Sequence, residues 1–399
     1  MSRRRWPQML VLLAVVVLVA TGCANDAPLD TLEPKGFFSE KIDGLFNMVF
    51  IVAIVVFVLV QGGILFIAGK YRHKGEYKED DFPAQVHGNF TLEVGWTILP
   101  AVILAVVTVP TLATLFTLTD EPDGDFNDCI TVYGQQWWWA YDYDVGCDGA
   151  EGDPPDIRTA TEMVIPAGEQ IGLKIASRDV IHSFWIPALN GKRDAVPNRV
   201  TNWNTHANEP GIYLGQCTEF CGLSHGVMRM HVKALSADDY EAWKVEQMAP
   251  AAVPTDEAAL RGREVFQAQC ASCHTVREEG GTGNASASYA EVAVARETSP
   301  VPLVNGMAPD LTHFAGRERF LAGLEELYFD IDGDGFGERD QFNRVALEQW
   351  LRNPLSIKEM APDPVEIPGS DIPKGRGMPN LNLSETTIDD LVEYLRTLE

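Results

Sequence analysis

The sequence predicts a multidomain protein with two transmembrane helices, a β-sandwich or barrel, and an all-α C-terminal domain. Three observations lead to this prediction. The first third of the chain contains two long apolar stretches, residues 120–237 contain short β-prone runs, and helical periodicity follows residue 256. The length of 399 residues suits two or three domains, and a hydrophobic content of 46% excludes a wholly disordered chain.

The N-terminal residues 1–22 are typical of a secretory signal. The run Arg3-Arg4-Arg5 precedes an apolar stretch, and small residues stand directly before Cys23. This arrangement resembles a bacterial lipobox, in which the cysteine is lipidated and becomes the new N-terminus. An ordinary cleaved signal with an incidental cysteine is the alternative.

Residues 23–119 hold the two apolar stretches, at 48–69 and 94–118. Each is close to the roughly 20 residues that a helix needs to cross a bilayer, and neither contains a charged residue. The segment between them carries basic residues, namely Lys70, Arg72, Lys74 and Lys78. Such residues stay in the cytoplasm, so both ends of the hairpin should lie outside it, as the export signal also requires.

The middle of the chain, residues 120–240, should form the β domain. Proline and glycine punctuate its β-prone runs, which are residues 130–133, 137–143, 170–175 and 212–214. An Ala- and Pro-rich linker is expected over 241–256, and the C-terminal domain over 257–399. Cys129 and Cys147 are candidates for a disulfide because export permits one, and two free thiols are the alternative.

Residues 217–228 read Cys-Thr-Glu-Phe-Cys-Gly-Leu-Ser-His-Gly-Val-Met. They offer two thiolates, an imidazole and a thioether, and His182 lies upstream. This soft donor set favours copper over magnesium or calcium, whereas zinc more often takes four Cys or His ligands without Met. The alternative is a disulfide between Cys217 and Cys221, with the histidines and the methionine incidental.

The C-terminal domain contains Cys270-Ala271-Ser272-Cys273-His274, the c-type haem attachment signature. The two thiols would form thioethers, and His274 would bind the iron. A thioredoxin-like redox pair is the competitor, but it needs βαβ surroundings, whereas a helix with Thr255 as its cap leads into this motif. A last helix is expected from Ser384, with apolar residues on one face at positions 388, 391, 392, 395 and 398.

An acidic loop interrupts the C-terminal domain. Asp330, Asp332 and Asp334 occupy positions one, three and five of a stretch that resembles an EF-hand calcium loop. Position twelve is Gln341 where the bidentate glutamate would stand, so a solvated acidic turn is the alternative to a calcium site.

The donor run at 217–228 resembles subunit II of haem-copper cytochrome c oxidases, which carries a binuclear copper A centre. The family pattern Cys-x-Glu-x-Cys-x-x-x-His-x-x-Met matches at every position. The resemblance implies a cupredoxin-like β-sandwich. It also implies two bridging thiolates, one histidine on each copper, a methionine cap and a backbone carbonyl cap, carried by Cys217, Cys221, His182, His225, Met228 and Glu219. The Glu219 side chain would bind magnesium at the interface with subunit I.

Two further residues take roles from the same resemblance. The stretch 134–139 is similar to the aromatic segment of the electron-accepting surface, and Trp137 matches the residue that receives electrons. Glu93 stands three residues before Trp96 and matches the entrance of a proton pathway shared with subunit I. From the residues alone, each has a simpler alternative. Trp137 would only bury surface in the core, and Glu93 would only lie at the membrane boundary.

The C-terminal domain resembles a class I cytochrome c. In that family, the positions of Gly262, Phe266 and Tyr394 let the first and last helices cross closely. The second axial ligand should be a methionine, which raises the potential. Met378, in Gly377-Met378-Pro379, best resembles the ligand loop, with Met360 and Met307 as the other candidates.

The resemblance implies subunit II of the haem-c-containing branch of these oxidases. An external donor, a cytochrome c or a quinol-oxidising complex, would supply electrons to haem c, then copper A, then subunit I. Oxygen reduction to water and proton translocation would occur in subunit I, with subunit III as a further partner. This chain alone should not reduce oxygen. It would lie in a bacterial plasma membrane, with both cofactor domains on the extracytoplasmic side.

The formal net charge of −26 argues against nucleic acid as a partner. The alternative function is a membrane-anchored copper and haem module that serves another acceptor. A nitrous-oxide reductase would lack the helix hairpin and the fused haem domain. A quinol oxidase subunit II would lack the copper ligands.

Overall fold

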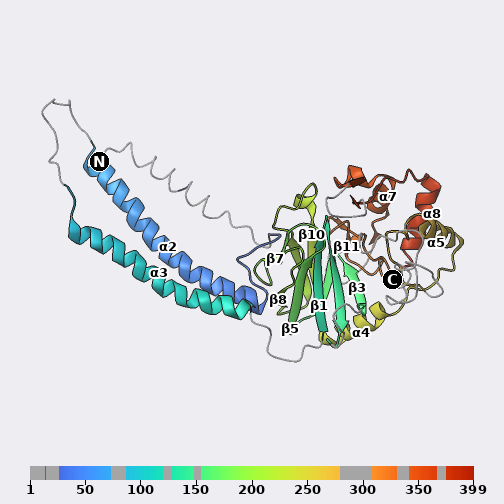
Figure 1. Ribbon diagram of the computed structural model, residues 1–399, viewed down its shortest axis with the longest axis horizontal. Coiled ribbons are helices and arrows are strands. Elements are labelled where there is room, and N and C mark those ends of the chain that lie inside the picture. The colour runs from blue at the N-terminus through green and yellow to red at the C-terminus, as the bar shows by residue number, and fades with distance from the viewer. Residues whose placement is uncertain are drawn as a thin grey trace.

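The computed structural model describes residue 14 and residues 27–72, 87–119, 128–147, 154–278, 308–329, 341–365 and 374–399. Figure 1 shows a helical hairpin, a β-sandwich and a C-terminal domain arranged in a row, which confirms the predicted fold class. Cys23, Met307 and the acidic loop with Asp330, Asp332 and Asp334 lie outside the described residues.

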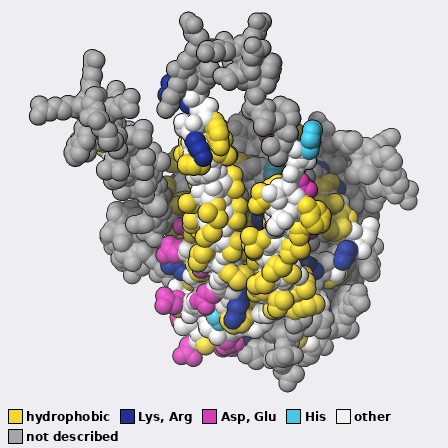
Figure 2. All heavy atoms as spheres, turned by 90° about the vertical axis from the view of Figure 1, so that its left-hand side faces the viewer, with side chains coloured by type: hydrophobic (Ala, Val, Ile, Leu, Met, Phe, Trp, Pro, Cys, Tyr) yellow, Lys and Arg dark blue, Asp and Glu magenta, His cyan; other side chains and the backbone are white. Residues whose placement is uncertain are grey.

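The hairpin consists of α2 (Phe37–Lys70) and α3 (Phe90–Thr119), which run side by side away from the sandwich (Figure 1). Both helices are long and apolar enough to cross a membrane. Figure 2 shows hydrophobic side chains gathered along this pair, where lipid can cover them. Thr97, Thr108 and Thr111 donate their hydroxyl hydrogens to backbone carbonyls four residues earlier, so these polar groups are satisfied within α3.

The start of α2 is fixed to the sandwich. The hydroxyl of Ser39 donates to the Ala188 carbonyl at 2.6 Å, and the Asn208 side chain donates to Glu40 at 2.8 Å. Ser39 is buried, so water competes little for its bond. These contacts join the membrane anchor to the β domain.

The β domain contains a five-stranded sheet, a three-stranded sheet and a two-stranded hairpin, with strand orders β3-β2-β1-β5-β8, β4-β10-β9 and β6-β7. β1 runs parallel to β5 and β4 parallel to β10, and the other pairs are antiparallel. The strands are β1 (Asp128–Gln135), β2 (Trp138–Val145), β3 (Ile157–Ala160), β4 (Glu162–Pro166), β5 (Gln170–Ser177), β6 (His182–Phe184), β7 (Arg193–Ala195), β8 (Thr201–His206), β9 (Gly211–Gln216) and β10 (Arg229–Leu235). The four β-prone runs of the sequence lie in or beside β1, β2, β5 and β9.

The core between the two large sheets is rich in aromatic side chains. Trp139, Tyr141 and Tyr143 of β2 are fully buried among aliphatic residues of the other strands. A disulfide joins Cys129 in β1 to Cys147 just beyond β2, with their Cα atoms 5.2 Å apart. The rim of this sandwich therefore rests on a large, tightly filled core.

In its described residues, the C-terminal domain packs three α-helices: α5 (Glu257–Gln269), α7 (Arg344–Arg352) and α8 (Glu385–Leu395). Gly262 lets α5 and α8 cross closely, because a Cβ there would lie 2.0 Å from the Asp390 carbonyl oxygen. The rings of Phe266 and Tyr394 meet beside this crossing at 5.5 Å. The close helix crossing that the resemblance implied is confirmed.

Short elements fill the rest of this domain. They are β11 (Arg319–Phe320), β12 (Glu325–Glu326), β13 (Tyr328–Phe329), β14 (Gln341–Phe342), η3 (Pro354–Ser356), β15 (Ala361–Val365) and β16 (Lys374–Arg376). The strands pair as three small antiparallel hairpins. Together they connect the helices and carry the loops that face the sandwich.

Two local expectations differ from the structure. Asp256, not Thr255, caps α5, because the Asp256 carboxylate accepts hydrogen bonds from the backbone N–H groups of Ala258 and Ala259. The expected linker at 241–256 begins inside α4 (Ala237–Met248), so only its second half is non-helical. Ser384 caps α8 as its sequence position suggests.

Candidate copper and haem sites

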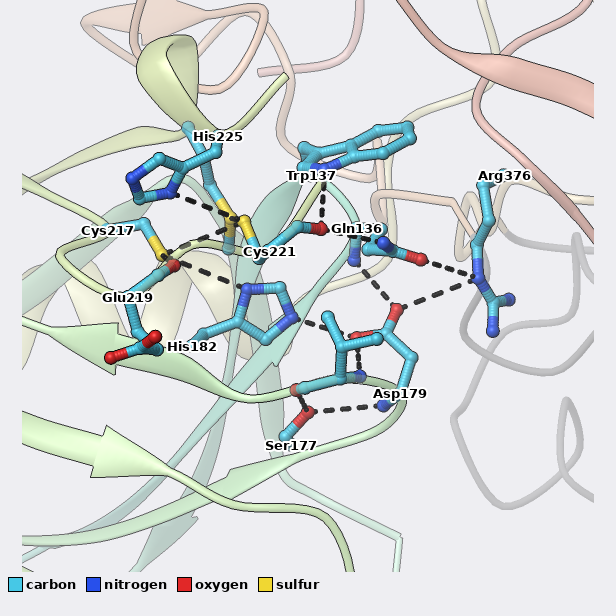
Figure 3. Close-up of polar contacts among 12 residues, drawn as sticks. Gln136, Trp137, Ser177, Asp179, His182, Cys217, Glu219, Cys221, His225 and Arg376 are labelled. Atoms are coloured by element: carbon cyan, nitrogen blue, oxygen red, sulfur yellow. Dashed lines mark hydrogen bonds and ion pairs between the residues drawn. The ribbon is translucent and has the colours of Figure 1, made fainter. Parts of the chain in front are cut away.

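The candidate copper ligands lie at one rim of the sandwich. Cys217 directly follows β9, and Met228 directly precedes β10. These strands are antiparallel neighbours with Gln216 opposite Arg229, so the loop between them returns to its own starting point. His182 begins β6 and reaches the same rim (Figure 3). The register of β9 and β10 therefore closes the donor loop, and β6 brings the distant histidine to the same rim.

The donor atoms face one another at short range. The Cys217 and Cys221 sulfurs are 3.9 Å apart, far beyond the roughly 2.05 Å of a disulfide, and both are free thiols. His182 Nδ1 lies 3.9 Å from the Cys217 sulfur, and His225 Nδ1 lies 3.6 Å from the Cys221 sulfur. The Met228 sulfur is 3.7 Å from the Cys221 sulfur. This arrangement fits a metal centre with two central thiolates and one imidazole beside each.

Glu219, the third residue of the motif, contributes through its backbone. The Glu219 carbonyl oxygen lies 3.3 Å from the Cys217 sulfur. The Glu219 side chain is exposed and points away from the sulfurs (Figure 3). The geometry thus fits a carbonyl donor on the inside and a free carboxylate on the outside.

Burial and electrostatics prepare the two thiols for metal binding. Cys217 and Cys221 are 4% and 3% exposed, and Met228 is fully buried. The hydrogen bond from Cys221 lowers the pKa of Cys217 strongly, although burial opposes this, and the same contact raises the pKa of Cys221. One thiolate is therefore favoured in the protein itself. A soft donor set of this kind, buried and preformed, suits copper.

Asp179 orients the upstream histidine. One of its carboxylate oxygens accepts a hydrogen bond from His182 Nε2 at 2.8 Å, which leaves Nδ1 facing the thiols. Burial alone would lower the pKa of His182, but the hydrogen bonds with Asp179 and Cys217 outweigh it and raise the pKa. Asp179 was not predicted from the sequence, although a carboxylate three residues before His182 is a signal that could have identified it.

Trp137 and Gln136 hold the other side of the ligand loop. Trp137 Nε1 donates to the Cys221 carbonyl at 3.1 Å, and the Gln136 amide donates to the same oxygen at 2.7 Å (Figure 3). Trp137 is only 3% exposed, and Lys358 of the C-terminal domain donates to its backbone carbonyl. The structure therefore places Trp137 against the donor loop and beneath the C-terminal domain, away from solvent.

The haem attachment motif follows α5. Cys270 is the C-cap residue of this helix, and Cys270 and Cys273 are both free and half-buried. His274 Nδ1 donates to the Pro309 carbonyl at 2.8 Å, which leaves Nε2 available as a ligand. Burial raises the pKa of Cys270 to about 11 and lowers the pKa of His274, so the imidazole is neutral, as iron binding requires. These residues fit a covalently attached haem.

The two described candidates for the second axial ligand occupy different environments. Met378 packs against the core of the C-terminal domain, beside the same cluster that Cys270 contacts. Met360 packs instead against the core of the sandwich. Packing therefore favours Met378 as the haem ligand and gives Met360 a place between the two domains.

Glu93, the candidate for proton uptake, lies in the first turn of α3. Its carboxylate accepts a hydrogen bond from the Asn89 backbone at 3.2 Å and is exposed. It stands at the end of the hairpin that is remote from the sandwich (Figure 1). The structure therefore keeps Glu93 apart from the copper ligands.

Together, the helix hairpin, the donor rim and the haem motif define a membrane-anchored protein with sites for copper and for covalently bound haem. The family model of the cytochrome c oxidase subunit II periplasmic domain matches residues 129–235, and that of its transmembrane domain matches residues 37–114. The cytochrome c family model matches residues 259–323. The two domain matches imply copper A and haem c as cofactors, and the hairpin match indicates membrane anchoring.

Comparison with whole proteins gives the family. The chain is 33% identical to cytochrome c oxidase subunit 2 of Alkalihalophilus pseudofirmus, covering 97% of this chain and 96% of that protein. It is 31% identical to the same subunit of Bacillus sp. strain PS3, covering 82% and 79% respectively. A solved structure of the periplasmic domain of subunit II of the Bradyrhizobium japonicum cytochrome oxidase is 27% identical, covers 33% of this chain and 96% of its own, and has a TM-score of 0.27. The chain belongs to the cytochrome c oxidase subunit II family and carries a C-terminal cytochrome c domain.

Proposed function

We propose that this chain is subunit II of a haem-copper terminal oxidase and takes electrons from an external donor for delivery to subunit I. The observation that carries the proposal is the convergence of His182 with the donor loop 217–228, in a chain that also has a haem attachment motif with its histidine oriented. Copper A and haem c, when bound, would each take up and release one electron, which is the chemistry that this function needs.

The residues of the chain have defined tasks in this proposal. Copper A would be held by His182, Cys217, Glu219, Cys221, His225 and Met228. Haem c would be held by Cys270, Cys273, His274 and Met378. A buried, tightly packed rim limits movement of the copper ligands, and little movement favours rapid electron transfer. Electrons would reach the haem domain first and the copper domain second.

The remaining assignments belong to the same proposal. The exposed carboxylate of Glu219 is available for magnesium at the interface with subunit I, and Glu93 is available to admit protons for translocation. Cys23 would carry a lipid, and calcium would occupy the acidic loop at 330–334. Both cofactor domains would lie on the extracytoplasmic side of a bacterial plasma membrane. Oxygen reduction to water, coupled to proton translocation, would occur in subunit I, with subunit III as a further neighbour.

The experiment is purification of the complex from its native membrane, followed by copper, haem and subunit analysis and by measurement of oxygen consumption with a reduced cytochrome c. We expect copper A and haem c on this chain, a haem-bearing partner subunit, and oxygen consumption that cyanide stops. A preparation with both cofactors but no haem-bearing partner and no oxygen consumption would contradict the oxidase. It would favour a membrane-anchored module for another acceptor.

A further inference from the structure

One arginine of the cytochrome c domain lies against residues that hold the copper ligands. Arg376 ends β16 and stands two residues before Met378. Its Nε donates to the Gln136 side-chain oxygen at 3.2 Å and lies 3.8 Å from a carboxylate oxygen of Asp179 (Figure 3). Gln136 also contacts the Cys221 carbonyl, and Asp179 contacts His182 Nε2. Arg376 therefore contacts two residues that each contact a copper ligand. It also stands two residues before the candidate haem ligand in the sequence.

Asp179 is in place to hold this arginine. Its side chain is 5% exposed, and its two oxygens accept hydrogen bonds from His182 Nε2 and from the Gln136 backbone N–H at 2.8 Å each. A buried carboxylate is stabilised by a nearby cation, and the C-terminal domain presents Arg376 to it.

A second contact joins the two domains next to the arginine. A Cβ added at Gly377, whose φ is +108°, would lie 2.5 Å from the Met360 sulfur. Met360 packs in turn against the sandwich core that contains Trp137. The haem-ligand loop thus rests on Met360, and only a glycine leaves room for this approach.

The short segment before β15 ties the copper loop to the same place. Lys358 is buried and donates to the Trp137 carbonyl, and the Ser224 hydroxyl donates to the Glu359 carbonyl at 2.5 Å. Ser224 belongs to the copper-ligand loop. This segment therefore contacts the loop directly at Ser224, and it contacts Trp137, which itself donates to the loop.

The domain interface continues away from the metal site. Lys233 of β10 pairs with Glu318 at 2.5 Å, and the Glu318 backbone N–H donates to Glu162 at 3.1 Å. Ala322 packs in a small apolar cluster with Trp138 of β2. A docked position that is held by polar, charged and apolar contacts is fixed in register, whereas a transient encounter would rely on exposed charges.

We propose that Arg376 is a positioning residue that sets the register of the haem-ligand loop on the copper site. It acts through Gln136 and Asp179 and does not touch either cofactor. The inference rests on the proposed function, and it adds that the fused domain occupies the electron-accepting face around Trp137. An external donor would then have to meet the cytochrome c domain, because the surface next to Trp137 is already covered.

The test uses the complete oxidase complex with Arg376→Ala, Arg376→Lys and a matched control, Arg352→Ala. Arg352 is 43% exposed and pairs with Glu385 inside the cytochrome c domain, so the control removes an arginine and an ion pair without touching the copper domain. The haem is reduced by a laser flash with a ruthenium dye. Electron arrival at copper is followed by near-infrared absorbance, and the haem thioether–iron band and the copper electron paramagnetic resonance spectrum are recorded for each variant.

We expect Arg376→Ala to slow haem-to-copper transfer by about tenfold or more, because small displacements of reacting groups cost large factors in rate. Both spectra should keep their wild-type form, and Arg352→Ala should keep the wild-type rate. The transfer rate of Arg376→Lys should lie between that of Arg376→Ala and that of the wild type. The lysine keeps the positive charge but lacks the planar fork of the guanidinium. If Arg376→Ala misfolds, Arg376→Lys and Arg376→Gln, which both lose the planar fork that faces Gln136 and Asp179, should still slow transfer.

Three results would overturn the inference. The first is an Arg376→Ala rate equal to that of Arg352→Ala. The second is a steep dependence of the wild-type rate on ionic strength, which a buried docking contact should not show. A change in the copper spectrum of Arg376→Ala would also count against it, because the arginine would then support the copper site itself. A wild-type complex with neither cofactor signal would instead defeat the proposed function.

Discussion

The copper site and the haem site of this chain are built in opposite ways. The copper donors come from one twelve-residue loop and one histidine, and their sulfur and nitrogen atoms already face one another at 3.6 to 3.9 Å. The haem site has a local attachment motif, and its candidate second ligand packs against the core of its own domain. The loop that carries this ligand also reaches the copper domain, because Arg376 donates to Gln136. The copper donors thus come from one domain, whereas the haem-ligand loop contacts both.

The largest expected effect is the loss of the copper site with the haem site left intact. Cys221→Ser should abolish binuclear copper binding, because this thiolate faces His225, Met228 and Cys217 at once. Haem attachment should be unchanged, since Cys270 and Cys273 lie in the C-terminal domain, where Cys270 packs against a separate core. Copper analysis and haem spectra of the purified variant measure both. Retention of a normal copper spectrum would remove this cysteine from the site.

The next effect tests which methionine completes the haem site. Met378→Ala should remove the thioether–iron absorption band and leave the copper content unchanged, because Met378 packs with the haem-domain core. Met360→Ala is the matched control, since Met360 packs on the sandwich core and should keep the band. The thioether–iron absorption band of the oxidised protein reports the result. Loss of the band in Met360→Ala and its retention in Met378→Ala would make Met360 the haem ligand.

Acid should weaken the interface between the two domains through Glu162. Burial raises the pKa of Glu162, but hydrogen bonding and charge from His231, together with Lys233, outweigh it and lower the pKa from 4.5 to about 2. A lowered pKa stabilises the fold above pH 4.5, and this contribution is lost as the pH falls towards 2. The contribution of Glu162 to the free energy of unfolding is at most about 3 kcal/mol.

Glu162→Gln tests this assignment. Acid unfolding, followed by near-ultraviolet circular dichroism, should be less steep between pH 4.5 and 2 in the variant than in the wild type. Lys174→Gln, with a side chain that is exposed on β5, is a control for a simple charge change. Equal pH slopes for the wild type and Glu162→Gln would show that other groups control acid unfolding.

The smallest effect concerns the helix crossing that carries the haem motif. Gly262→Ala should destabilise the cytochrome c domain by roughly 1–3 kcal/mol, because its Cβ would overlap the Asp390 carbonyl and force α5 away from α8. Thermal unfolding followed by haem absorbance measures the loss. Gly211→Ala is the control, because a Cβ there meets only the Tyr213 ring and hydroxyl at ordinary contact distances, 3.6 Å or more. Identical midpoints for both variants would show that the helices separate without cost.

The comparison also explains how much the sequence could predict. The copper donors and the haem motif were readable because each set lies within a few residues, apart from His182. The apolar stretches, the β-prone runs and the last helix were equally local, and the structure contains all of them. Local spacing therefore predicts the fold class and the donor sets.

Contacts between distant residues were not predictable in this way. Arg376 and Gln136 are 240 residues apart, and no spacing or periodicity relates them. Trp137 is buried, and its backbone carbonyl accepts a hydrogen bond from Lys358, in a domain that the sequence placed beyond a linker. The sequence thus indicates what each domain binds, whereas the docking of one domain on the other appears only in three dimensions.

The measurement that tests the account most directly is copper and haem analysis of the purified oxidase complex, combined with electron paramagnetic resonance of the copper. The account predicts one covalent haem c and one copper pair on this chain. It also predicts a hyperfine pattern in which one unpaired electron is shared by two copper nuclei. A pattern from a single copper nucleus, or zinc in place of copper, would contradict it.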